Sequence, residues 1–178
     1  MSKQGIAFDN PVRNVLVVCT GNICRSPMAE YYLGDCLEKG GAQGRVTVTS
    51  VGTNALVDYS AAQPAVETMA DLGLNLASHQ ARQLEIEGIE EADLILTMEE
   101  YHRLEVISLV PEAAEKTYCL KAYPKHASFM GVPDPYGLSR KAYARAFRQM
   151  RKQLDLICKD ILDSLSSVRD CQLNVGID

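Results

Sequence analysis

The feature that most constrains the fold of this chain is VLVV at residues 15–18, a run of apolar residues with no polar residue between them. A strand with one face in water alternates apolar and polar side chains, whereas a strand covered on both faces, as in a parallel sheet, does not need to alternate. ADLILTM at residues 92–98 has the same character, RVTVTSVG at 45–52 alternates, and KTYCL at 116–120 is shorter. The sequence therefore predicts four strands, two of them buried on both faces.

Between and after these segments, apolar residues recur at helical spacing. We expect helices over residues 28–37, 63–74 and 99–110, and one long helix over residues 143–165 with a polar tail, 166–178, behind it. Strand and helix thus alternate along the chain, which favours a parallel α/β sheet with helices on both faces. The carboxyl ends of parallel strands meet at one edge of the sheet, and ligands of such folds bind there.

Length, charge and cysteine content limit the classes of function. A chain of 178 residues is long enough for one domain, and its net charge of −5 argues against nucleic acid as a partner. No apolar run is long enough to span a membrane, and residues 1–14 lack the apolar core of a signal peptide, so we expect a cytoplasmic protein. Most of the six cysteines then remain reduced thiols and their spacing fits no metal site, so we expect neither a metal nor a cofactor.

The segment after the first strand, VCTGNICRSP at residues 18–27, places Cys19 and Arg25 in a short loop that opens a helix, with five residues between them. Inward-pointing backbone N–H groups and a helix N-terminus attract anions there and favour the thiolate form of Cys19. The planar fork of Arg25 matches two oxygens of a phosphate group. Gly21 allows the backbone to approach the anion, and Asn22 tolerates the left-handed conformation of a tight loop. The loop therefore predicts a site for a tetrahedral dianion above a sulfur nucleophile.

A carboxyl group follows the fourth strand in VPDPYG, residues 132–137. Asp134 stands between Pro133 and Pro135, whose fixed φ angles stiffen the loop. At the same edge of the sheet, this group is suited to protonate a leaving oxygen as a general acid. It would then activate water as a general base when a phosphocysteine is hydrolysed.

Together, VCTGNICRSPMAE, the TSVGT after the second strand, SHQARQL and the late DPYG resemble the low-molecular-weight protein tyrosine phosphatase family in order and spacing. The resemblance covers residues 14–165 and leaves residues 1–13 as an N-terminal extension. We accordingly expect a single-domain three-layer sandwich whose four-stranded parallel sheet has the flavodoxin-like strand order 2-1-3-4. The implied activity is hydrolysis of phosphotyrosine monoesters through a phosphocysteine, and the implied partner is a phosphotyrosine-bearing protein, a bacterial tyrosine kinase being one theme of the family.

By the same resemblance, Cys19 is similar to the family's nucleophile, Arg25 to its phosphate-binding arginine and Asp134 to its general acid. Ile23 resembles the apolar floor of the substrate cleft and Tyr136 its aromatic wall. The substrate-binding residues implied in this way are Thr20, Gly21, Asn22, Ile23, Cys24, Ser26 and Tyr136, and the residues that support the loop are Ser50 and His79. Asn22 also resembles part of the hydrogen-bonding set that fixes the loop, and Ser26 resembles the serine whose hydroxyl supports the thiolate as nucleophile and leaving group. Gly137 departs from many members, which carry a second aromatic residue there, and this departure bears on substrate preference.

Three other functions remain open on the sequence. A protein-arginine phosphatase carries threonine where this chain has Ile23, and an apolar residue there better suits an aromatic ring. An arsenate reductase needs further cysteines after the second helix, and residues 73–97 contain none. A phosphate-binding module without catalytic activity would tolerate the loss of Cys19 or Asp134, and both are present.

Cys24 has two interpretations. It is either a small apolar packing residue or, as the family resemblance implies, a thiol that captures the oxidised form of Cys19 as a disulfide and so protects the nucleophile. We predict no redox role for the remaining cysteines, Cys36, Cys119, Cys158 and Cys171.

Overall fold

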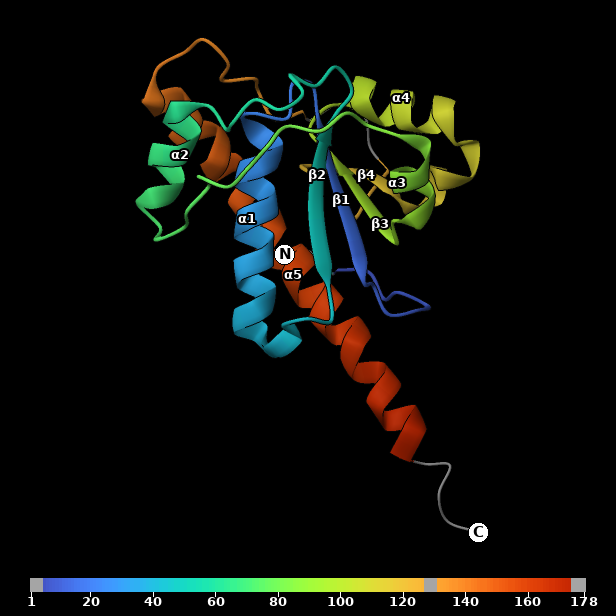
Figure 1. Ribbon diagram of the computed structural model, residues 1–178. Helices are drawn as coiled ribbons and strands as arrows, with labels where there is room; N and C mark the ends of the chain where they lie inside the picture. Colours follow the sequence, from blue (N-terminus) through green and yellow to red (C-terminus); the bar gives the residue numbers. More distant parts are fainter. Residues whose placement is uncertain (1–4, 127–130, 174–178) are drawn as a thin grey trace.

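The computed structural model describes residues 5–126 and 131–173. Its sheet is entirely parallel and has the strand order β2-β1-β3-β4, which confirms the predicted flavodoxin-like topology (Figure 1). The strands are β1 (Asn14–Cys19), β2 (Thr47–Gly52), β3 (Leu94–Thr97) and β4 (Thr117–Cys119).

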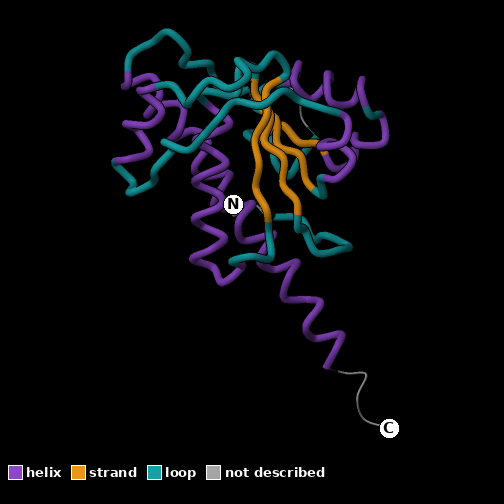
Figure 2. Tube along the Cα trace, in the orientation of Figure 1, coloured by secondary structure: helices purple, strands orange, loops and turns teal. Residues whose placement is uncertain are grey.

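Helices cover both faces of this sheet, so the molecule has three layers (Figures 1 and 2). The helices on one side are α1 (Arg25–Leu37), α2 (Gln63–Ala70) and α5 (Arg140–Leu173), and those on the other are α3 (Ile86–Glu91) and α4 (Glu100–Leu109). A π turn (Glu38–Ala42) follows α1, and a 3₁₀ turn (Pro111–Lys116) precedes β4. None of the described helices combines the length and the apolar content that a membrane-crossing segment needs.

The central strand β1 shows why an unbroken apolar run belongs at this position. Val15, Val17 and Cys19 face the larger hydrophobic cluster, which includes α1, α2 and α5. Leu16 and Val18 face the smaller cluster, which includes α3 and α4. Because successive side chains of a strand point to opposite faces, a strand between two helical layers is apolar at every position. The Cys19 side chain ends this run on the α1 side of the sheet.

Two helices differ from the sequence prediction. The pattern does not predict α3, because this helix is six residues long and Ile89 is its one buried apolar residue, too little to show a helical period. Helix α2 ends at Ala70 rather than at residue 74, and the chain then turns at Gly73, whose φ of +76° is in the left-handed region. A glycine in this conformation after a helix is a common stop signal.

The last helix is longer than its apolar pattern suggests. It begins at Arg140, three residues earlier than expected, and runs past Leu165 to Leu173, into the segment expected as a polar tail. The rest of that tail, residues 174–178, and residues 1–4 of the N-terminal extension lie outside the described residues.

The described part of the N-terminal extension packs against this helix. The backbone N–H of Ile6 donates to Asp160 (3.1 Å), and the N–H of Val12 donates to the Ser164 hydroxyl (3.2 Å). Asp160 also accepts a hydrogen bond from the Tyr123 hydroxyl (2.8 Å). The extension thereby connects the C-terminal half of α5 to the entry of β1.

At the carboxyl edge of the sheet, Gly52 allows the loop after β1 to pass over β2. A Cβ atom at this position would lie 2.2 Å from the carbonyl oxygen of Thr20 and 3.0 Å from the backbone nitrogen of Asn22. Both are backbone atoms of the loop, so no side-chain movement can relieve the overlap. The close approach of β2 to the loop therefore requires glycine.

We predict that Gly52→Ala lowers the free energy of unfolding by about 1–3 kcal/mol, the usual range for overpacking a well-filled region. Urea denaturation measures this loss. Gly34→Ala is the matched control, because Gly34 lies inside helix α1 and, apart from the nearby backbone of that helix, its added Cβ meets no atom within 4 Å. Alanine should stabilise that position by up to about 1 kcal/mol. Equal losses in the two variants would contradict the steric argument.

Candidate active site

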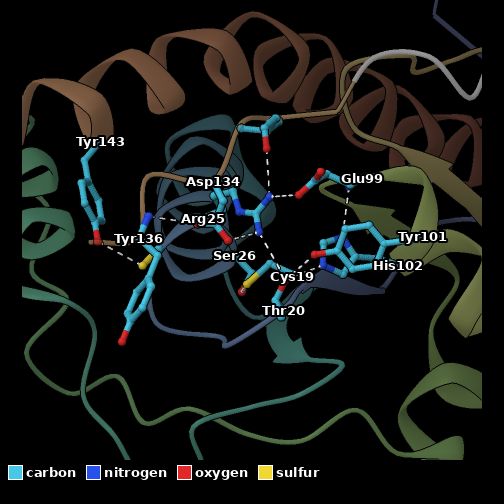
Figure 3. A network of polar contacts seen from close by, with 12 residues as sticks. Cys19, Thr20, Arg25, Ser26, Glu99, Tyr101, His102, Asp134, Tyr136 and Tyr143 are labelled. Carbon is cyan, nitrogen blue, oxygen red and sulfur yellow. Dashed lines mark hydrogen bonds and ion pairs between the residues drawn. The ribbon is translucent and has the colours of Figure 1, made fainter. Parts of the chain in front are cut away.

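The loop between β1 and α1, residues 19–25, lies at the carboxyl edge of the sheet and forms the floor of a pocket (Figure 3). Cys19 at its start is 2% exposed and Arg25 at its end is 1% exposed. The pocket has a volume of about 200 Å³ and is lined by Cys19, Thr20, Gly21, Ile23, Cys24, Arg25, Asn54, Leu56, Asp134 and Tyr136. The structure therefore brings together most of the residues that the sequence predicts for the site.

Asn22 holds the loop from behind rather than lining the pocket. Its φ of +56° is left-handed, and the residue is fully buried. The side-chain nitrogen donates to the hydroxyls of Ser26 and Ser50, both at 2.8 Å, and the side-chain oxygen accepts from the backbone N–H of Arg82 (2.8 Å). Because a backbone N–H can only donate, this contact also fixes which end of the amide faces the serines. Asn22 thus makes the loop-fixing hydrogen bonds that the resemblance implies for it, and neither Asn22 nor Ser26 is among the residues that line the pocket.

Ser26 presents its hydroxyl to the sulfur of Cys19. The two side-chain atoms lie 2.9 Å apart, and both are buried. Since the Ser26 oxygen already accepts from the amide of Asn22, its proton is available to donate to the sulfur. A hydroxyl donor in this place stabilises a thiolate.

The predicted supporting residues, Ser50 and His79, both contact the loop, and Glu30 extends their network. The Ser50 hydroxyl donates to the Glu30 carboxylate (2.5 Å), and Nε2 of His79 donates to the carbonyl oxygen of Asn22 (2.7 Å). Burial lowers the pKa of His79, so its imidazole is neutral near pH 7. Sequence reasoning missed Glu30, although its place one helical turn after Ser26 puts both on the same side of α1.

Arg25 is held by two carboxylates and a carbonyl oxygen. One terminal nitrogen, Nη1, bonds to Glu99 and to the carbonyl oxygen of Val132 (2.9 Å), and Nη2 bonds to Asp134 (2.7 Å). Its Nε is buried and has no hydrogen-bond partner among the described residues. A buried donor without an acceptor is costly in free energy. An oxyanion that enters the pocket can therefore accept a hydrogen bond from Nε of Arg25.

Asp134 lies at the rim of the same pocket. One carboxylate oxygen bonds to Arg25, and the other accepts the backbone N–H of Tyr136 (3.1 Å). The Asp134 side chain is 42% exposed, and the Tyr136 ring beside it is 63% exposed at the mouth of the pocket. The acid is therefore within reach of both the anion site and solvent.

Helix α4 supplies a second support for the loop. Nδ1 of His102 accepts the backbone N–H of Glu99 (3.1 Å), so Nε2 carries the proton and donates to the Thr20 hydroxyl (3.0 Å). Burial and the charge of Arg25 lower the pKa of His102 to about 3, so the ring stays neutral. The Tyr101 hydroxyl bonds to the same Thr20 hydroxyl (Figure 3).

Sequence reasoning missed the contributions of α4 and of the segment after β2, namely Glu99, Tyr101, His102, Asn54 and Leu56. The one signal available for the α4 residues is topological. They follow β3, and β3 is the neighbour of β1 in the predicted strand order, so the residues after it face the loop.

Cys24 lines the pocket together with Cys19, and its sulfur lies 3.2 Å from the Tyr143 hydroxyl of α5. Burial raises the pKa of the Cys24 thiol to about 11. Cys24 is therefore protonated near neutral pH. Among the described residues, no group of three or more His, Cys, Asp or Glu side chains is placed to hold a metal ion.

Comparison with known proteins agrees with this geometry. Residues 14–170 match the family model described as low molecular weight phosphotyrosine protein phosphatase. A putative low molecular weight protein-tyrosine-phosphatase of Klebsiella pneumoniae is 40% identical over 75% of this chain and 87% of its own. The tyrosine phosphatase Wzb of Escherichia coli K30, solved with sulphate, is 29% identical with a TM-score of 0.74 over 84% of this chain and 99% of its own. The YwlE arginine phosphatase of Geobacillus stearothermophilus is also 29% identical, with a TM-score of 0.72 over 93% and 99%.

Proposed function

The chain belongs to the low-molecular-weight phosphotyrosine protein phosphatase family, and on this premise we propose that it hydrolyses phosphotyrosine monoesters through a phosphocysteine on Cys19. One observation carries the proposal: a buried sulfur, an unpartnered guanidinium donor of Arg25 and the carboxyl group of Asp134 converge on one small pocket. These are the nucleophile, the anion binder and the acid that phosphoryl transfer to sulfur requires.

In the first step, the Cys19 thiolate attacks phosphorus and the bond to the tyrosine oxygen breaks. Arg25 and the loop N–H groups hold the phosphoryl oxygens, and Asp134 gives its proton to the leaving oxygen. The phosphoryl group takes the place of Asp134 at the guanidinium, which releases the carboxyl group for this role. Ser26, whose hydroxyl is available to the sulfur, stabilises the thiolate before attack.

In the second step, water attacks the phosphocysteine. Asp134, now a carboxylate, takes a proton from this water, and the bond between sulfur and phosphorus breaks. The electron pair returns to Cys19, where the Ser26 hydroxyl again stabilises the thiolate as a leaving group. Phosphate then leaves the pocket and the enzyme is restored.

We predict that Asp134→Ala lowers kcat for a phosphotyrosine peptide by about 10²–10⁴, the usual contribution of a general acid. The loss should be much smaller for p-nitrophenyl phosphate, because its phenol leaves with little need of a proton. Steady-state kinetics on the two substrates measure the difference. Cys19→Ser is the control and should abolish turnover of both. An equal loss on both substrates in Asp134→Ala would assign Asp134 a structural role.

The walls of the pocket support an aryl substrate. Ile23 is 7% exposed, and the exposed side chains of Leu56 and Tyr136 line the same pocket. These apolar groups fit the flat ring of phosphotyrosine, whereas a phosphoguanidinium group would need polar partners. The second candidate, a protein-arginine phosphatase, is favoured by the likeness to a solved arginine phosphatase.

A panel of substrates separates these candidates. We expect kcat/KM for a phosphotyrosine peptide to exceed that for the same peptide with phosphoarginine by at least tenfold, and we expect no reduction of arsenate. Ile23→Thr should lower this ratio, because it replaces an apolar contact with the aryl ring by a hydroxyl. Faster hydrolysis of phosphoarginine by the wild-type protein would favour the second candidate.

We further propose that residues 14–165 form the catalytic domain and that the substrate is a phosphotyrosine-bearing protein, a bacterial tyrosine kinase being one candidate. The exposed ring of Tyr136 at the mouth of the pocket supports a substrate that extends beyond its phosphoaryl group. Phosphate release from an autophosphorylated tyrosine kinase tests the partner.

A protective role for Cys24 is a separate proposal about this site. Peroxide oxidises the Cys19 thiolate to a sulfenic acid with loss of hydroxide, and the Cys24 sulfur then attacks the Cys19 sulfur with loss of water to form a disulfide. The high pKa of Cys24 directs the first oxidation to Cys19 rather than to Cys24.

We predict that dithiothreitol restores most activity to the wild-type protein after brief peroxide treatment, and that it restores far less to Cys24→Ser. Without a resolving thiol the sulfenic acid proceeds to sulfinic acid, which dithiothreitol does not reduce. Hydrolysis of p-nitrophenyl phosphate measures the recovered activity. Mass spectrometry of the Cys19 peptide distinguishes the disulfide with Cys24 from the sulfinic acid. Cys36→Ser, a partly exposed thiol outside the pocket, should recover like wild type. Full recovery of Cys24→Ser would leave Cys24 as packing alone.

A further inference from the structure

The first half of α5 differs sharply in charge from the rest of the chain. The protein has a net charge of −5, yet residues 140–154 contain no acidic residue. All basic side chains of this stretch are exposed: Arg140, Lys141, Arg145, Arg148, Arg151 and Lys152. A segment of one charge on the surface of an acidic protein creates a local positive potential.

Two of these side chains already have partners within the protein. Arg140 forms ion pairs with Asp71 and Glu67, and Arg151 donates to the Tyr32 hydroxyl (3.1 Å). In the described part of the chain, the remaining four form neither an ion pair nor a side-chain hydrogen bond; they are Lys141, Arg145, Arg148 and Lys152. We call these four residues the basic stripe. Their charges are available to a molecule outside this chain.

The spacing of the basic stripe places its members on one side of the helix. Lys141, Arg145, Arg148 and Lys152 follow one another at intervals of four, three and four residues, so they lie in a row along α5. At 1.5 Å per residue the row is about 16 Å long. An extended peptide of about five residues covers that length.

One member of this row, Arg145, lies beside the segment that carries the proposed acid. Arg145 lines a surface cavity of about 260 Å³ together with Pro133, Asp134, Pro135 and Leu138, which belong to the segment that carries the proposed acid. Asp134 also lines the phosphate pocket, so the cavity at Arg145 adjoins that pocket. A peptide bound with its phosphotyrosine in the pocket therefore passes close to the basic stripe.

The second half of α5 shows how a solvated face of the same helix is built. There Lys159 pairs with Asp163 one turn later, as mixed charges on an exposed helix commonly do. The basic stripe has no such compensation along its row. Unpaired positive charge is therefore specific to the basic stripe and is not found at the Lys159–Asp163 pair of the same helix.

We propose that the basic stripe binds an acidic segment of the phosphoprotein substrate, about five residues long and next to the phosphotyrosine. The proposal rests on the phosphatase function proposed above and adds a sequence preference to it. Lysine and arginine attract aspartate and glutamate at long range, which raises the rate of encounter and orients the peptide toward the pocket. The attraction weakens as salt increases.

Two phosphotyrosine peptides test the preference, one with five flanking glutamates and one with five flanking serines. We expect the wild-type kcat/KM to be at least tenfold higher for the acidic peptide at low salt, and this ratio to fall toward one in 0.5 M sodium chloride. Arg145→Glu with Arg148→Glu should abolish the preference without changing hydrolysis of p-nitrophenyl phosphate. Arg13→Glu is the matched control, an exposed arginine at the amino end of β1, and should retain the preference.

A peptide flanked by lysines gives the reciprocal test. The variant with both Arg145→Glu and Arg148→Glu should prefer the lysine-flanked peptide over the acidic peptide. Loss of folding cannot produce such a new preference. Binding of fluorescent peptides to the same variants made in a Cys19→Ser background, followed by anisotropy, reports the preference without turnover. A failure of phosphotyrosine hydrolysis, which concerns the proposed function, is thereby distinguished from a failure of the stripe.

Equal wild-type kcat/KM and affinity for the glutamate and serine peptides would overturn the proposal, and so would a preference that survives the double reversal. Sedimentation with vesicles of phosphatidylserine, against vesicles of phosphatidylcholine, tests the other source of negative charge. Vesicle binding that depends on Arg145 and Arg148, without any peptide preference, would make the stripe a membrane-facing surface and overturn the proposal as well.

Discussion

The site depends on the side-chain amide of Asn22, which joins three segments of chain at one buried point. Its nitrogen binds the hydroxyls of Ser26 and Ser50, and its oxygen binds the backbone of Arg82. Buried polar groups of this kind favour the single conformation in which all of them are paired. Under the proposed mechanism, a loop fixed before substrate arrives needs little reorganisation during the reaction.

Arg25 sets the electrostatics above this loop. Its guanidinium is buried between Glu99 and Asp134, and Glu99 is the less exposed of the two carboxylates. A phosphate dianion that displaces Asp134 puts negative charge beside it and removes its hydrogen bond to the arginine. The same displacement thus frees the carboxyl group that lies at the rim of the pocket.

Local sequence patterns predict those parts of the structure that are formed by one continuous stretch of chain. The apolar run of β1 and the loop from Cys19 to Arg25 are contiguous, so their composition and spacing reveal both the strand and the anion site. Glu99 and His102 contribute only because β3 lies beside β1, a relation between distant segments that no local pattern displays. Asn22 has the left-handed backbone expected of a tight loop, and its amide binds Ser50 and the backbone of Arg82, a partner in a distant segment that no local pattern indicates.

The N-terminal extension changes what counts as the folded unit of this chain. The match to the family model begins at residue 14, yet Ile6 before that boundary supplies one of the two hydrogen bonds described for Asp160, which is 5% exposed. A chain cut at the boundary would leave this carboxylate with the Tyr123 hydroxyl as its remaining donor and would uncover the surface beneath Phe8. Homology therefore delimits the part shared with relatives, whereas the hydrophobic core of this chain also includes residues that precede it.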